Sequence, residues 1–152
     1  MNEVEFKKYL EKLEHYCAYQ ERCISEVKLK MTKIKVPSEF TDNLINSLLE
    51  NKFIDEERYV RAYVHSKVTY KRDGVEKIRY GLKHKGIRDN LINEVCAELD
   101  KICYQANLEA LINKKKETLI AKYDKQETKT KLVRYLLSKG YRYDEFRNFI
   151  SQ

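Results

Sequence analysis

The sequence predicts an all-α protein made of three tandem three-helix repeats, packed in series into an elongated, curved molecule. Composition is the first observation: the 152 residues include one proline and four glycines, so little turn chemistry is present. Lys, Glu, Leu and Ile are frequent, which favours helix. Second, apolar side chains and tyrosines recur at helical spacing. Third, one helical pattern occurs three times.

The repeated pattern is a pair of apolar residues four positions apart, followed four residues later by a reversal of the chain. In chain order its copies are Val27, Met31 and Lys35; Ile78, Leu82 and Gly86; and Leu132, Leu136 and Gly140. In the first copy Val36–Pro37 supplies the break. Lys85 and Lys139 match directly before the glycines. A sharp helix end favours a left-handed residue, so Gly86 and Gly140 are expected to have positive φ.

Each anchor helix is preceded by a longer helix and followed by another one. The preceding helices are marked by Leu10, Leu13 and Cys17; by Tyr59, Ala62, Tyr63 and Ser66, with Asp55 as N-cap; and by Leu108, Leu111, Ile112 and Leu119. The following helices are marked by Phe40, Leu44, Ile45 and Leu48; by Leu91, Ile92 and Val95; and by Phe146, Phe149 and Ile150.

The predicted repeats are 1–51, 52–101 and 102–152, and they form one continuous repeat domain. Three helices of this size bury too little apolar surface to be stable alone, so the repeats are expected to pack in series. A serial array has a long exposed surface. That shape suits binding along a filament or a strand better than it suits a catalytic pocket.

Several function classes are excluded by what the sequence lacks. No apolar run exceeds three residues, and the N-terminus is charged, so we expect no membrane association and a cytoplasmic protein. The four cysteines fall among apolar positions and are expected to be small buried thiols. His15, Cys17 and Cys23 cluster without completing a zinc set, so neither metal nor cofactor is expected.

Catalytic motifs are also missing. The glycines have no phosphate-loop spacing, HExxH is absent, and the three histidines lie far apart. The acidic clusters Asp55–Glu57 and Asp144–Glu145 open helices, where negative charge offsets the helix dipole. The sequence therefore predicts a protein that is not an enzyme.

Positive charge is concentrated in the middle of the chain. The formal net charge is +7. Residues 58–88 include ten basic residues and two acidic ones, whereas residues 1–50 include eight basic and nine acidic residues. On the helix that begins near Val75, the side opposite Ile78 and Leu82 is basic. The candidate binding residues are Lys71, Arg72, Lys77, Arg79, Lys83, Lys85 and Arg88. Such a surface can meet phosphates or an acidic protein, and an ordinary solvated helix surface is the competing interpretation.

Four stretches resemble, in order, the bacterial RecX regulatory proteins. They are ERCISEVKLKM (21–31), FIDEERYVRAYV (53–64), GVEKIRYGLKHKGI (74–87) and LVRYLLSKGYRYDEF (132–146). Gly74, Ile78, Leu82 and Gly86 match the family frame fully. Cys23 departs from the family's serine, Val27 from its leucine, and Val60 from its small residue.

The resemblance implies three tandem three-helix repeats and a non-catalytic regulator. Its implied partner is the filament that the recombinase RecA forms on single-stranded DNA, whose strand exchange, ATP hydrolysis and coprotease activity it restrains. Single-stranded DNA itself would be bound weakly or through the filament, and the protein is expected to be a monomer. The alternative is a RecA-independent helical protein that binds nucleic acid with the same basic face. A scaffold for another acidic partner is a third possibility.

Overall fold

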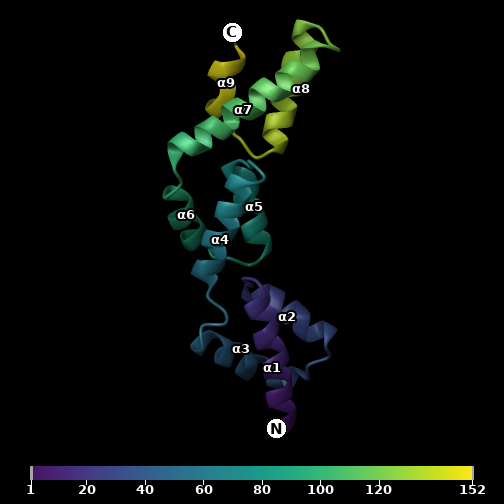
Figure 1. The fold of residues 1–152 in the computed structure, drawn as a ribbon, viewed down its shortest axis with the longest axis vertical. Coiled ribbons are helices and arrows are strands. Elements are labelled where there is room, and N and C mark those ends of the chain that lie inside the picture. Colours follow the sequence, from purple (N-terminus) through teal and green to yellow (C-terminus); the bar gives the residue numbers. More distant parts are fainter. Residues whose placement is uncertain (1, 152) are drawn as a thin grey trace. The chain divides into compact units, whose positions relative to one another are not determined.

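The computed structural model describes residues 2–151, and within them every regular element is helical (Figure 1). The α-helices are α1 (Glu3–Tyr19), α2 (Ile24–Lys33), α3 (Thr41–Glu50), α4 (Glu56–Thr69), α5 (Val75–His84), α6 (Asp89–Ala97), α7 (Lys101–Ile120), α8 (Lys125–Ser138) and α9 (Tyr143–Ile150), with a 3-10 turn at Ser38–Phe40. The all-α prediction is confirmed. None of the helices between residues 2 and 151 combines the length and the apolar character that a bilayer crossing requires.

Side-chain caps fix where four of these helices begin. Asn2, Asp100 and Asp124 accept hydrogen bonds from backbone N–H groups in the first turns of α1, α7 and α8. The Asp55 carboxylate accepts from the Arg58 N–H at 3.1 Å, which confirms the cap predicted for α4. These bonds satisfy donors that a helix leaves free at its start.

The chain reversals after α2, α5 and α8 share one backbone geometry. Gly86 has φ +79° and Gly140 has φ +97°, as predicted. In the first copy the left-handed residue is Lys35 itself, with φ +59°, so the break lies there and not in Val36–Pro37 alone. The residue after the left-handed one donates its N–H to the carbonyl of the second anchor residue. Val36 donates to the Met31 carbonyl at 2.9 Å, and Tyr141 donates to the Leu136 carbonyl at 3.1 Å.

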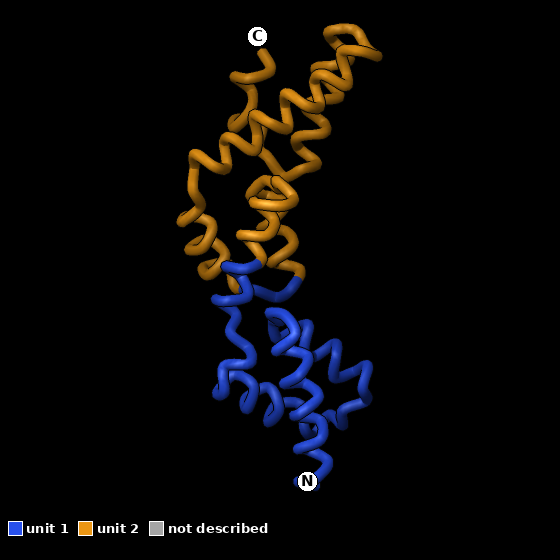
Figure 2. The backbone as a smooth tube through the Cα atoms, in the orientation of Figure 1, with its two compact units in different colours: residues 1–62, 85–87 blue, residues 63–84, 88–152 orange. Residues whose placement is uncertain are grey.

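The backbone forms two compact units, residues 1–62 with 85–87 and residues 63–84 with 88–152 (Figure 2). In unit 1, helices α1, α2 and α3 enclose an apolar core. Its buried residues are Leu13, Cys17, Val27, Met31, Phe40, Leu44, Ile45, Leu48 and Ile54. The Glu56 carboxylate accepts from the Ile24 N–H at 3.1 Å and so joins the start of α4 to the start of α2. The boundaries 1–51, 52–101 and 102–152 stay a prediction drawn from the sequence period.

Unit 2 contains the core that α7, α8 and α9 share. Its buried residues are Leu108, Leu111, Ile112, Leu119, Leu132, Leu136, Tyr141, Phe146 and Ile150. On α5 and α6, Ile78, Leu82 and Ile92 are also fully buried. These are the apolar stripes that the sequence indicates.

The buried side of α4 differs from the prediction. Ala62 and Ser66 are exposed, whereas Val60, Val64 and Val68 are buried. The valines repeat every four residues and bury more apolar surface than Ala and Ser can, so they determine which side of the helix faces inward. Tyr59, from the predicted set, is buried as expected.

Candidate functional site

Helix α5 presents a largely basic and aromatic outer side. Ile78 and Leu82 are buried, while Lys77 and Lys83 are exposed, as the helical spacing predicts. Tyr80 is 67% exposed, and its ring stacks on that of His84 with centroids 5.2 Å apart. This side of α5 therefore offers cations and an accessible aromatic ring together.

Lys71 and Arg72 lie in the loop before α5, and Arg88 lies directly before α6. All three side chains are exposed, and no ion pair among residues 2–151 includes any of them. The backbone of the loop is held firmly even so. The Lys71 carbonyl accepts from the Lys139 ammonium, and the Arg72 carbonyl accepts from the Tyr141 hydroxyl, both at 2.7 Å. These three cations are available to a partner.

Other predicted residues have partners inside unit 2. Lys77 lies 3.7 Å from the Asp73 carboxylate, and Lys83 lies 3.6 Å from that of Asp89. Arg79 is half-buried and donates to the Asn93 side-chain oxygen. The Lys83–Asp89 pair is exposed and exchanges readily with another anion, whereas Lys77 is paired with a buried carboxylate and Arg79 has less freedom to move.

Lys85 has a structural role that the sequence does not reveal. Within unit 1 its ammonium pairs with the Glu26 carboxylate at 3.2 Å, and its carbonyl accepts from the Ser25 hydroxyl at 2.7 Å. Lys139, the matching residue of the last copy, does the same within unit 2. Its ammonium pairs with Asp73 at 3.1 Å, and its carbonyl accepts from the Gly74 N–H at 2.7 Å.

The match between the stretches around Lys85 and Lys139 thus reflects a repeated junction. In each case a lysine just before a left-handed glycine holds the start of the corresponding helix of the preceding copy. Lys85 therefore stabilises the fold, and its ammonium is a weaker candidate for a partner than those of Lys71, Arg72 and Arg88.

Burial favours the neutral form of a thiol in unit 1 and of two tyrosines in unit 2. Burial raises the pKa of the Cys17 thiol to about 11, so it is protonated at neutral pH and a poor nucleophile. Burial also raises the pKa of Tyr104 and Tyr141 in unit 2. Cys17, Cys23 and Cys96 are buried, but Cys103 is exposed, contrary to the expectation for all four. Among the described residues no group of three or more His, Cys, Asp or Glu side chains could hold a metal ion.

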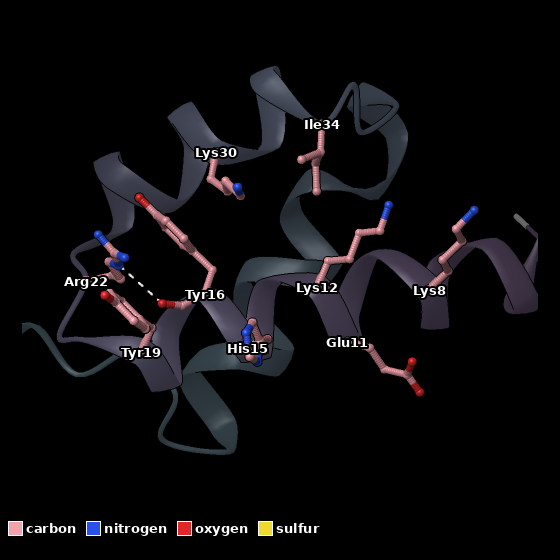
Figure 3. Close-up of a pocket in the computed structure, with 9 residues that line it drawn as sticks. All are labelled: Lys8, Glu11, Lys12, His15, Tyr16, Tyr19, Arg22, Lys30 and Ile34. Atoms are coloured by element: carbon pink, nitrogen blue, oxygen red, sulfur yellow. Dashed lines mark hydrogen bonds between the residues drawn. The ribbon is translucent and has the colours of Figure 1, made fainter.

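A further basic surface, which the sequence did not indicate, lies in unit 1 as a groove lined by α1 and α2 (Figure 3). The near-balance of charge over residues 1–50 conceals it, because the groove collects positive side chains from two helices. Only the packing of α1 against α2 brings them together.

The fold and these surfaces define an all-helical protein of three-helix domains whose candidate site is an exposed basic surface. Two family models match it: the second three-helix domain of RecX at residues 55–95 and the third at 103–150, together more than half of the chain. The chain belongs to the RecX family.

Curated relatives agree with this assignment. A Regulatory protein RecX from Clostridium acetobutylicum is 30% identical over 135 residues, which is 84% of this chain and 60% of the relative. One from Bacillus mycoides is 31% identical over 143 residues, 94% of this chain and 52% of the relative. The chain thus spans about half to three-fifths of the length of these relatives.

Two solved structures share the fold. A crystal structure of a regulatory protein RecX has a TM-score of 0.89 at 21% identity, covering 97% of this chain and 74% of the other. The RecX structure from Lactobacillus salivarius has a TM-score of 0.84 at 22% identity, covering 97% and 96%. At this identity the likeness shows the fold alone.

Proposed function

We propose that this chain is a regulatory protein that binds the RecA filament on single-stranded DNA and restrains its recombinase, ATPase and coprotease activities. The observation that carries the proposal is family membership: two RecX domain models match the chain, and curated relatives aligned over most of it are named as regulatory proteins. Restraint of RecA is what the resemblance to this family implies.

The contact surface that we assign to this function is the basic face of unit 2. It consists of Lys71, Arg72, Lys77, Lys83 and Arg88, with Arg79 at its edge. Three of these cations have no internal ion pair among the described residues, and Lys83 forms an exposed pair that a filament's phosphates or carboxylates can replace. Lys77 is exposed, although its ammonium lies 3.7 Å from the buried Asp73 carboxylate. Lys85 is left out of this set because its ammonium is engaged with Glu26.

A second function fits the same face: direct binding of nucleic acid without RecA. The observation in its favour is the exposed Tyr80 ring among the lysines of α5, because exposed aromatic rings next to cations stack bases while the cations hold phosphates. The two functions differ in what they need. A RecA regulator requires the filament, whereas a nucleic-acid binder retains its affinity for bare DNA and depends steeply on salt.

Co-sedimentation distinguishes the two. The chain is mixed with filaments of the same organism's RecA on long single-stranded DNA, with RecA alone and with the DNA alone, at physiological salt. We expect the chain to sediment with the filament in a saturable ratio and to remain mostly in solution with bare DNA. Equal sedimentation with DNA in the absence of RecA would favour the alternative, and no sedimentation with filaments would exclude both the proposal and this surface.

A further inference from the structure

The groove of unit 1 is a concave site of about 620 Å³ (Figure 3). One wall is a stripe along α1 and the other comes from α2 and the loop before it. It is lined by Lys8, Glu11, Lys12, His15, Tyr16, Tyr19, Arg22, Lys30 and Ile34. All nine residues belong to unit 1, and none of them is among the basic residues of unit 2.

The charge of the groove contrasts with the chain around it. Residues 1–50 carry eight basic and nine acidic side chains. The groove, in contrast, is lined by four basic side chains and one acidic side chain. Figure 3 shows Glu11 pointing away from α2, while Lys12 extends toward it and Lys30 points back from α2. No ion pair between residues 2 and 151 involves these four basic residues, so their charge is not neutralised internally.

Two tyrosine rings line the groove, and one of them is open for stacking. The Arg22 guanidinium lies 3.8 Å from the centroid of the Tyr16 ring and donates from Nε to the Tyr16 carbonyl at 3.2 Å, which fixes its orientation. The Lys30 ammonium is 5.2 Å from the same ring. Tyr19, one turn further along α1, is 79% exposed, so its ring is open to a ligand.

We propose that this groove is a binding site for single-stranded nucleic acid, in which Tyr19 stacks on a base and Lys8, Lys12 and Lys30 bind phosphates. Lys8 and Lys12 are one turn apart, about 6 Å along the axis of α1, so each can meet a different phosphate. An acidic peptide would satisfy the cations but brings a planar ring to Tyr19 only where it has an aromatic residue, whereas every nucleotide joins a planar base to a phosphate. A duplex keeps its bases stacked inside, whereas an unpaired strand can offer them.

The test uses the full chain and a labelled thymidine oligonucleotide of about 15 nucleotides, within the range of known single-strand site sizes. Fluorescence anisotropy gives the affinity over a range of salt concentrations. In Lys8→Gln/Lys12→Gln, we expect the slope of log affinity against log salt to shrink by about 0.7 for each phosphate that the variant no longer binds. The matched control is Lys28→Gln/Lys33→Gln, two exposed lysines of α2 outside the groove, for which the slope should stay that of the parent.

Stacking is tested with an abasic strand of equal length. The parent should prefer the thymidine strand about 5-fold or more, the scale of one stacked base, and Tyr19→Ala should lose that preference. Tyr19 is exposed, so its replacement leaves the core intact. Three results would overturn the proposal. The parent could bind both strands with equal affinity, the control variant could reduce the salt slope as much as Lys8→Gln/Lys12→Gln, or the parent could fail to bind the thymidine strand at low salt. Stronger competition by poly-glutamate than by the oligonucleotide would instead assign the groove to an acidic protein. RecA is absent from this assay, so its outcome is independent of the function proposed above.

Discussion

Gly74 and Gly140 lie backbone against backbone, at the point where α5 begins and α8 ends. A Cβ on Gly74 would overlap the carbonyl group of Gly140, and one on Gly140 would lie 2.6 Å from the Lys77 nitrogen. The close approach allows the N–H groups of Gly74 and Glu76 to donate to the carbonyls of Lys139 and Gly140 at 2.7 and 3.0 Å. The Val75 N–H donates to the Tyr104 hydroxyl at 2.9 Å, so the first donors of α5 are satisfied by α7 and the end of α8.

Alanine at Gly74 or Gly140 should therefore destabilise the protein more than alanine at Gly86. Apart from Gly86 and its two chain neighbours, no atom of residues 2–151 lies within 4 Å of a Cβ on Gly86, so only the left-handed backbone opposes the change, at about 1 kcal/mol. At Gly74 and Gly140 a Cβ would meet backbone atoms that must move, and Gly140 is left-handed as well, so we expect a loss of about 2 kcal/mol or more. Urea denaturation of the three variants gives these values.

Lys35→Gly is a control in which the change in stability should have the opposite sign. Lys35 is exposed and left-handed at the matching position, so glycine should relieve backbone strain and stabilise the protein by up to about 1 kcal/mol. If Gly86→Ala cost as much as Gly140→Ala, the close backbone approach would not be the reason for glycine there.

Lys139→Met should destabilise unit 2 by about 2 kcal/mol or more, because the buried Asp73 carboxylate would lose its nearest cation. The Asp73 side chain is only 5% exposed, and Lys77 at 3.7 Å would compensate in part. Adding Asp73→Asn to Lys139→Met should recover part of the loss, since no buried charge then remains. Thermal unfolding measures both. Two additive, independent losses would argue against this ion pair as a stabilising interaction.

Above pH 10 the free energy of unfolding should fall partly because of two buried tyrosines. Burial raises the pKa of Tyr104 and Tyr141 in the folded state above the value near 10 of an unfolded chain. Their contribution is thus fully present below pH 10 and is lost as the pH rises toward the folded pKa values, because the unfolded state releases these protons first. Each tyrosine contributes a slope of up to about 1.4 kcal/mol per pH unit.

Urea titrations between about pH 9 and pH 11 test this sign. Tyr104→Phe/Tyr141→Phe will be less stable at neutral pH, since it loses the hydrogen bonds to the Val75 N–H and the Arg72 carbonyl. Its stability should nevertheless fall less steeply with pH than that of the parent. An identical slope would mean that these hydroxyls ionise equally in both states.

Local chemistry made much of the fold predictable. Glycine just after an apolar helical pair indicates a left-handed residue at the helix end, so the positive φ of Gly86 and Gly140 was correctly predicted. Lys35 was missed because a lysine gives no such signal. The buried side of α4 was predicted wrongly because the prediction followed the helical spacing from Tyr59. Val60, Val64 and Val68 together bury more apolar surface and determine which side faces the core. The elongated shape stays a prediction.

The candidate site was less predictable than the fold. Helical spacing correctly indicated that Lys77 and Lys83 are exposed, because it needs only the positions of Ile78 and Leu82. The pairing of Lys85 with Glu26 joins residues 59 positions apart, and the groove of unit 1 depends on how α1 packs against α2. Neither can be derived from local spacing.

Charge reversal on the basic face of unit 2 should weaken filament binding without unfolding the chain. The variant is Lys71→Glu/Arg72→Glu/Lys83→Glu/Arg88→Glu, in which every position is exposed. Each exposed change costs within about 0.5 kcal/mol, so the fold should survive. The matched control reverses Lys33, Lys122, Arg134 and Arg147, which are equally exposed and lie outside both proposed surfaces. Co-sedimentation with RecA filaments should fall steeply for the face variant and little for the control; equal losses would mean that only net charge matters.

The most direct measurement of the central claim is ATP hydrolysis by preformed filaments of the same organism's RecA on single-stranded DNA, followed while this chain is added. The account predicts inhibition that deepens with the ratio of chain to RecA, that the control variant retains and that the face variant largely loses. Undiminished hydrolysis at every ratio, with a chain shown to be folded by circular dichroism, would contradict it.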